Sequence, residues 1–199
     1  MADPIENENP LDDKVEVRGQ VVVVLTNTTT GKKRTYEARN LVTTAGSQYY
    51  AERGALLTSG TPIGPVPSNF TDTNGVPDMV MELWSDAGTP NSAPAIGNDY
   101  DDMLGTLATG SSQAIDGTYP LVNDTGDADN TGDGPEVLTY RVSYATGDAN
   151  LANISDVILT NPSPGAAEPL LMHAEFGAPF TKTSADTLKV FVNHTFSTP

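Results

Sequence analysis

The chain has no cysteine among its 199 residues, and this absence removes several kinds of site. Without a thiol the protein has no disulfide framework, no thiolate metal site and no cysteine nucleophile. Aromatic residues make up only 7% of the chain. A glycan hydrolase needs two carboxylates across a cleft and aromatic surfaces for sugar stacking, so this composition favours a protein that is not an enzyme.

Long apolar runs are also missing. No stretch approaches the roughly 20 apolar residues that a membrane-spanning helix needs. The first residues, MADPIENENPLDD, have neither the basic nor the apolar region of a secretory signal. We therefore expect no membrane partner and assembly in the cytoplasm.

Positive charge is scarce and unevenly placed. Ten basic residues oppose 26 acidic ones, giving a net charge of −16. Residues 1–53 hold seven of the basic residues and are nearly neutral, whereas residues 54–199 hold three against 18 acidic ones. This balance disfavours nucleic acid as a partner. Two interpretations stay open: general solubility, or a near-neutral part that docks on a partner while the acidic remainder faces outward.

The residues that are present favour strands. The chain contains 18 Gly and 15 Pro residues, and these residues interrupt helices, so long helices are not expected. Alternation of apolar and polar residues predicts about eight strands, at residues 14–26, 33–42, 78–85, 119–122, 137–144, 154–160, 170–176 and 187–196. We expect an all-β fold, a two-layer β-sandwich or jelly roll.

One segment, Asn40–Leu57, reads as a helix, with Thr43 or Thr44 as its N-cap. Within it, Tyr49 with Leu56 and Tyr50 with Leu57 lie two turns apart and share a side. We expect one short helix at about 44–57, stable only when it is docked on the sheet.

The polar residues 1–13 carry no pattern and predict an extended arm, followed by one β-sandwich domain at 14–199. The arm is either a disordered tail or a partner-binding segment. Its candidate anchors are Pro4, Ile5, Pro10 and Leu11.

Four aspartates crowd into one loop and suggest a calcium site: Asp124, Asp127, Asp129 and Asp133. The spacing begins like a calcium-binding loop, but Leu138 stands where a bidentate Glu is required, and no helices flank the loop. The favoured prediction is a mobile acidic tip without a cofactor, and calcium is the alternative.

No catalytic group emerges from the motifs. His194 falls on an apolar strand face, which predicts a core histidine. His173 has no serine, cysteine or second acid placed by a recognisable motif to use it. Lys32, Lys33 and Arg34 cluster at a predicted hairpin end, which favours a solvated turn over a binding patch.

Three pieces, in this order, resemble small virion proteins of tailed bacteriophages. They are the first hairpin with the helix NLVTTAGSQYYAERGALL, the strand that leads into WSDAGTPNSAPAIGNDYDDML, and the closing AEFGAPFTKTSADTLKVFVNHTFS. Together they cover about two thirds of the chain. The chain departs from that pattern in its acidic insert at 124–133 and in its loop at 58–77.

The resemblance implies a structural role on the virion. Such proteins include capsid decoration or cement proteins with jelly-roll bodies, and also tail, baseplate or fibre-associated proteins. An acidic outer surface and the lack of fibre-like repeats favour a cement protein on the capsid surface. Its expected partners are the major capsid protein and further copies of itself, as a dimer or trimer. A carbohydrate-binding module on the virion is the alternative from another class.

Overall fold

The computed structural model describes residues 16–59, 79–134, 136–162, 164 and 167–197. The expected arm at 1–13, with its anchors Pro4, Ile5, Pro10 and Leu11, lies outside these residues, as does most of the 58–77 loop. In the described part, no helix has the length and apolar character to cross a membrane.

Ten strands form one antiparallel sheet. They are β1 (Glu16–Asn27), β2 (Lys33–Val42), β3 (Val80–Ser85), β4 (Thr106–Leu107), β5 (Gln113–Ala114), β6 (Leu121–Val122), β7 (Val137–Tyr144), β8 (Leu151–Thr160), β9 (Met172–Lys182) and β10 (Asp186–Ser197). The order across the sheet is β4-β3-β8-β9-β2-β1-β10-β7-β6, with β5 also paired to β3.

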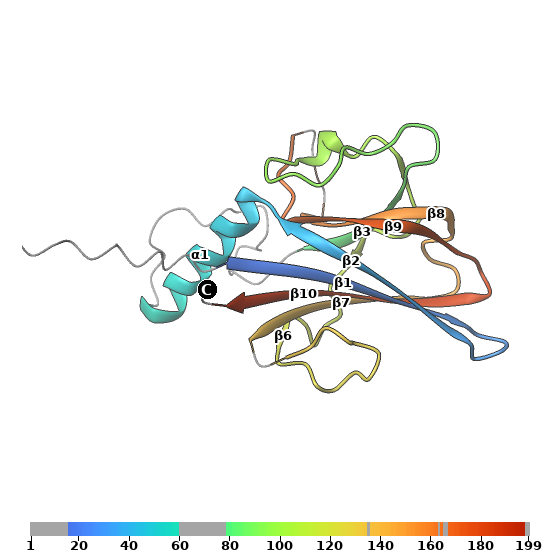
Figure 1. Cartoon of the computed structure of the whole chain (residues 1–199), viewed down its shortest axis with the longest axis horizontal. Helices are drawn as coiled ribbons and strands as arrows, with labels where there is room; N and C mark the ends of the chain where they lie inside the picture. Colours follow the sequence, from blue (N-terminus) through green and yellow to red (C-terminus); the bar gives the residue numbers. More distant parts are fainter. Residues whose placement is uncertain (1–15, 60–78, 135, 163, 165–166, 198–199) are drawn as a thin grey trace, which may run out of the picture.

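The sheet bends over on itself, so that β3, β8 and β9 form one layer and β1, β10 and β7 form the other (Figure 1). Strand β2 makes the corner. Its residues 33–40 pair with β1, and its last residues, 40–42, pair with β9. At the other side of the body, the Tyr144 hydroxyl of β7 donates to the Met81 carbonyl of β3 at 3.1 Å. Side chains therefore link the two layers where no strand crosses between them.

The core lies between these layers because alternate residues of each long strand point inward. The inward residues are Val21, Val23 and Leu25 from β1, Tyr140 and Val142 from β7, Leu188, Val190 and Val192 from β10, Met81 and Leu83 from β3, Val157 and Leu159 from β8, and Met172 and Phe176 from β9. These side chains are at most 3% exposed. The expected all-β, sandwich-like fold is confirmed, and its two layers are halves of one continuous sheet.

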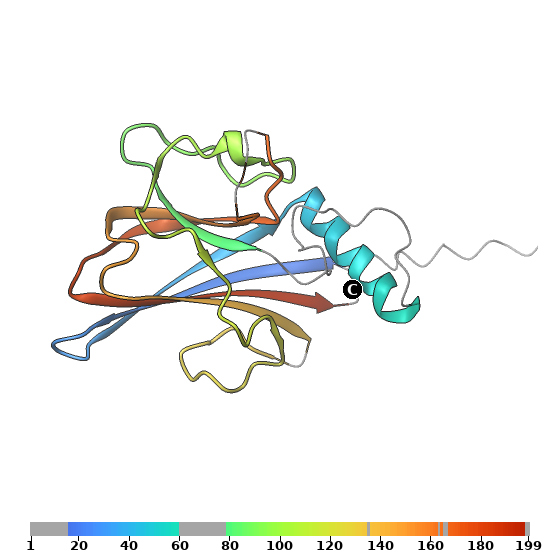
Figure 2. The same ribbon diagram turned by 180° about the vertical axis from the view of Figure 1, so that it is seen from behind.

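Loops cover parts of both outer faces (Figure 2). On the β3-β8-β9 layer, the 86–105 segment includes a short 3-10 helix (Tyr100–Asp102) and buries Met103 against Trp84 and Ile158. On the other layer, Val22, Val24 and Phe191 form a second small apolar cluster. Both faces of β1 and the single tryptophan are therefore buried.

Helix α1 (Thr44–Ser59) lies at one end of the sandwich (Figure 1). Thr43 is its cap, because its hydroxyl accepts from the Gly46 amide at 3.1 Å and donates to the Leu170 carbonyl. A Cβ at Gly46 would lie 2.1 Å from the Leu171 carbonyl oxygen, so the glycine permits close docking of the helix. Tyr49 enters the core, as predicted. The side chains of Leu56 and Leu57 lie outside the described ones.

Candidate interaction surface

The cationic side chains of the described residues divide into two groups. Lys182 is buried, while Lys33, Arg141 and Lys189 form ion pairs with aspartates. The remaining four whose side chains are described are exposed and belong to the β1–β2 hairpin: Arg18, Lys32, Arg34 and Arg39. In a molecule with a net charge of −16, this concentration makes the β1–β2 hairpin electrostatically different from the rest.

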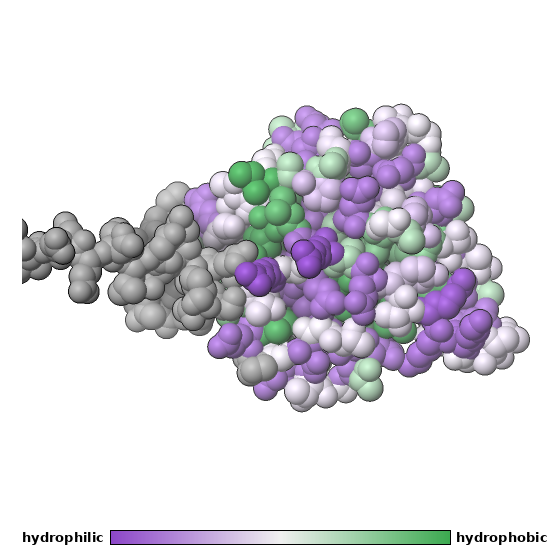
Figure 3. Space-filling view, in the orientation of Figure 1, coloured by the Kyte–Doolittle hydropathy of each residue, from purple (hydrophilic) through white to green (hydrophobic). Residues whose placement is uncertain are grey.

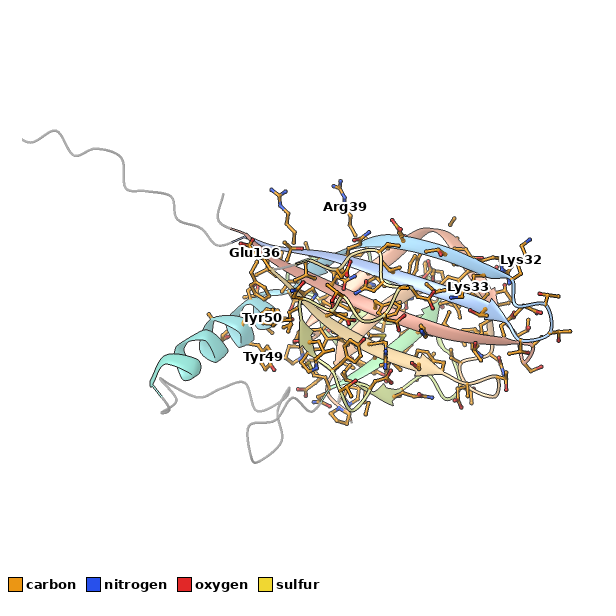
Figure 4. All side chains as sticks on the ribbon, turned by 90° about the horizontal axis from the view of Figure 1, so that it is seen from below. Lys32, Lys33, Arg39, Tyr49, Tyr50 and Glu136 are labelled. Atoms are coloured by element: carbon orange, nitrogen blue, oxygen red, sulfur yellow. The ribbon has the colours of Figure 1, made fainter. Side chains whose placement is uncertain are left out.

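A groove of about 800 Å³ lies along the start of β1 and the end of β2. We call it the arginine groove. Its lining residues are Val17, Arg18, Gly19, Gln20, Glu37, Ala38, Arg39, Asn40 and Leu41. Arg39 projects away from the sheet (Figure 4). This face presents strongly hydrophilic residues next to hydrophobic ones (Figure 3), which suits a ligand that has both carboxylates and apolar side chains.

Gly19 and Asn40 face the opposite side of the sheet from Gln20 and Arg39, because consecutive side chains of a strand alternate between its two faces. Asn40 pairs with Gly19 in the strand register, and a Cβ on Gly19 would lie 1.0 Å from the Asn40 Oδ1 atom. The Asn40 side chain therefore needs the glycine in order to lie across β1. From there its Nδ2 atom reaches His194 Nε2 at 2.8 Å.

His194 connects Asn40 to helix α1. Its Nδ1 atom hydrogen bonds with the Tyr50 hydroxyl, which also donates to the Tyr140 hydroxyl at 3.1 Å. Burial lowers the pKa of His194 to about 3, so the ring is neutral at ordinary pH. The expected core histidine is thus a structural link between the sheet and the helix (Tyr50 is labelled in Figure 4).

The acidic loop is held against the sheet by ion pairs. Lys189 Nζ lies 2.9 Å from Asp127 Oδ2 and 3.2 Å from Asp129 Oδ2. Lys33 Nζ lies 2.5 Å from Asp129 Oδ1, and Arg141 also pairs with Asp127. These contacts argue against the favoured prediction of a mobile acidic tip, because the loop is tied to strands β2, β7 and β10.

The four calcium candidates do not converge on one point. Asp127 and Asp129 share Lys189, but Asp124 accepts from the Tyr119 hydroxyl at 2.7 Å and Asp133 is exposed. Hydrogen bonds from Lys33 and Lys189 hold the pKa of Asp129 below its usual value despite partial burial. Among the residues that the structure describes, no three histidine or acidic side chains are grouped to hold a metal ion.

A buried polar network under the 86–105 segment is the place that most resembles a catalytic arrangement. His173 Nε2 lies 2.9 Å from Asp156 Oδ1, and His173 Nδ1 lies 3.1 Å from Asn98 Oδ1. Asp156 also accepts from Ser155 at 2.6 Å and from Asn91 at 2.8 Å. Both ring nitrogens are engaged and His173 is fully buried, so the network can hold the loop on the sheet but gives a substrate no access to the imidazole.

A second buried carboxylate, Glu82, lies in the same layer. It accepts from Trp84 Nε1 and from the Tyr100 hydroxyl, each at 3.1 Å. Neither Glu82 nor Asp156 was predicted from the sequence as a buried polar group. An acidic residue in an otherwise apolar strand, as in VMELWS, is the signal that could have identified a buried, hydrogen-bonded carboxylate.

The polar and charged features therefore fall into two kinds. The buried networks are internally hydrogen bonded, whereas the arginine groove and the hairpin tip at Lys32 and Arg34 lie at the surface of the molecule. Comparison of the chain with protein-family models, with curated proteins and with solved structures gives no match.

Proposed function

We propose that the protein is a structural component of a tailed-bacteriophage virion, a decoration or cement protein that binds the outer surface of the capsid. In this role it bridges neighbouring capsid subunits and works as a homo-oligomer. The proposal begins from the resemblance of three sequence pieces to such virion proteins.

The observation that carries the proposal is the segregation of charge. The exposed cationic side chains described above all belong to the β1–β2 hairpin, whereas the chain as a whole is strongly acidic. Such a molecule approaches an acidic partner with this hairpin and repels polyanions and other copies with the rest of its surface. A cement protein needs this one-sided attachment, since it must bind a closed shell without binding DNA.

The buried polar groups also favour a structural role over catalysis. The Asp156–His173 pair and Glu82 lie beneath the 86–105 segment, with their hydrogen-bonding atoms directed at protein partners. Their contribution is to fix a loop on the sheet. The open surfaces, by contrast, are suited to binding through charge and shape.

Co-sedimentation with capsids that lack decoration tests the proposal. The informative variant is Lys32→Gln/Arg34→Gln at the exposed hairpin tip (Lys32 is labelled in Figure 4). Its matched control is Ser112→Glu/Thr118→Glu, at exposed positions on either side of the short strand β5. Both changes make the net charge more negative by two, so they differ only in where the charge changes.

We expect the wild type and the control to bind capsids at a fixed, saturable ratio. The tip variant should bind about tenfold more weakly, the equivalent of about 1.4 kcal/mol. Equal binding by the tip variant and the control would remove the hairpin from the interface. If the wild type does not bind capsids but is retained on isolated tails or on a glycan array, a tail role or a carbohydrate-binding role would take the place of the capsid role.

A further inference from the structure

The arginine groove has the form of a site for an extended peptide segment. It follows two antiparallel strands, in which Gln20 pairs with Arg39 and Gly19 with Asn40. Its volume of about 800 Å³ falls in the range of ligand-binding clefts. Arg18 and Arg39 are both exposed, so two guanidinium groups stand on facing strands.

The chemistry of the lining indicates what kind of segment fits. A guanidinium group binds a carboxylate through two parallel hydrogen bonds, which favours Asp or Glu in the ligand. Val17 and Leu41 add apolar surface. Among the described lining residues one is acidic, Glu37, and it accepts hydrogen bonds from Gln20 and Thr131, each at 3.3 Å. The groove therefore suits a segment in which carboxylates stand near short apolar side chains.

Residues 1–13 of this same chain have that composition. The segment MADPIENENPLDD contains five carboxylates and no basic side chain, with Pro4, Ile5, Pro10 and Leu11 between them. Its charge is opposite to that of the groove. No partner from outside the chain is needed to supply a fitting ligand.

We infer that residues 1–13 of one copy bind in the arginine groove of a second copy. The strand direction favours exchange over self-binding. The groove begins at Val17, immediately after the arm joins β1, so an arm in its own groove would have to reverse within its last few residues. Thirteen extended residues span up to about 45 Å, which is enough to reach a neighbouring molecule.

Exchange of the arms between copies also reduces the electrostatic repulsion that opposes their assembly. Copies that each carry a net charge of −16 repel one another over most of their surfaces. Contact between an acidic arm and the two arginines replaces that repulsion with attraction at one place. The inference does not depend on the capsid, since it concerns only copies of this chain.

The first test measures oligomeric state by sedimentation velocity without any capsid. We expect the full chain to form dimers or larger oligomers. Deletion of residues 1–13 should give monomers, and so should Arg18→Glu/Arg39→Glu. The tip variant Lys32→Gln/Arg34→Gln should keep the wild-type state, because it leaves the groove unchanged. Thermal melting checks that each variant is folded.

The second test measures binding of a fluorescent peptide with the sequence of residues 1–13 to the truncated protein. Binding should weaken at least tenfold in Arg18→Glu/Arg39→Glu, and also for a peptide with its five carboxylates changed to amides. Equal binding to the groove variant would overturn the inference. A full chain that remains monomeric at all concentrations would overturn the exchange between copies. Capsid binding that survives either result leaves the capsid-binding role intact. A monomeric full chain would remove only the homo-oligomer from the proposed function, so failure of the inference and loss of capsid binding are told apart.

Discussion

Asp156 illustrates how a buried charge is held in this protein. Only 1% of the residue is exposed. Burial by itself would raise its pKa, but hydrogen bonds from His173, Ser155 and Asn91 outweigh that effect, and the pKa lies below its usual value. The carboxylate is therefore charged in the folded protein and is stabilised only as long as these donors stay in place.

Asp156→Asn should lower the free energy of unfolding by about 3 kcal/mol at pH 7, because it breaks a buried hydrogen-bonded pair. The matched control is Glu175→Gln on the neighbouring strand. Glu175 pairs with Asp156 in the strand register but is exposed, so this change should shift stability by no more than about 0.5 kcal/mol. Urea denaturation of the three proteins measures both effects.

The pH dependence of that difference tests the direction of the pKa shift. Because the folded pKa is lowered, the stabilisation by Asp156 is complete above the unfolded pKa of about 3.9 and is lost as the pH falls through the folded value. The gap between wild type and Asp156→Asn should therefore shrink below about pH 4. A gap that stays constant from pH 7 to pH 3 would contradict the assignment.

At the scale of elements, two loops are fixed to the sheet by different means. The 86–105 segment is held by buried polar groups and by Trp84 and Met103. The acidic loop is held by ion pairs at partly exposed positions, with 38% of the Lys189 side chain accessible. We therefore expect the acidic loop to respond to salt more strongly than the 86–105 segment does.

Lys189→Met should loosen the acidic loop while it keeps the apolar stem of the side chain. The loss of the ammonium group from Asp127 and Asp129 should cost about 1 kcal/mol. Hydrogen–deuterium exchange of residues 123–134 should become faster, and exchange of the 86–105 segment should not change. Lys32→Met, which removes the same charge from the hairpin tip, is the control. Equal exchange of the acidic loop in both variants would show that the ion pairs do not hold it.

For the whole molecule, the dominant quantity is the net charge. An excess of 16 negative charges opposes compaction through self-repulsion. Among the described residues, Lys33, Arg141 and Lys189 form local ion pairs with aspartates. Salt should therefore stabilise the fold as a whole, although it weakens individual ion pairs.

We expect the melting temperature to rise by about 3 °C between 0.05 M and 0.5 M sodium chloride, the equivalent of about 1 kcal/mol for a chain of this size. Calcium and magnesium at equal ionic strength should give equal shifts, because oxygens of Asp127 and Asp129 already accept from lysines. A shift with calcium that exceeds the shift with magnesium by several degrees would instead establish a calcium site. Differential scanning calorimetry provides the measurement.

The strands and the helix could be predicted from local pattern. Alternation in LTYRVSY identifies inward residues such as Tyr140 and Val142, because side chains of a strand point to opposite faces in turn. A hydroxyl residue before the helix, Thr43 or Thr44, predicts the N-cap, and the structure uses Thr43. Helical spacing places Tyr49 on one side of the helix, and this side chain docks in the core. The two-residue strands β4 and β5 were missed, since such short pairings carry no periodic signal.

The tertiary structure alone decided which distant residues meet. Lys189 and Asp127 are 62 positions apart, and Asp156 and His173 belong to neighbouring strands whose pairing the pattern left open. Arg18 and Arg39 come together because the register of β1 and β2 places them on one face. The sequence by itself determined the strands, the helix and the inward faces, because backbone geometry fixes these locally. Strand order, the docking of the acidic loop and the arginine groove depend on how the sheet bends and on which loops cover it, and only long-range packing settles those contacts.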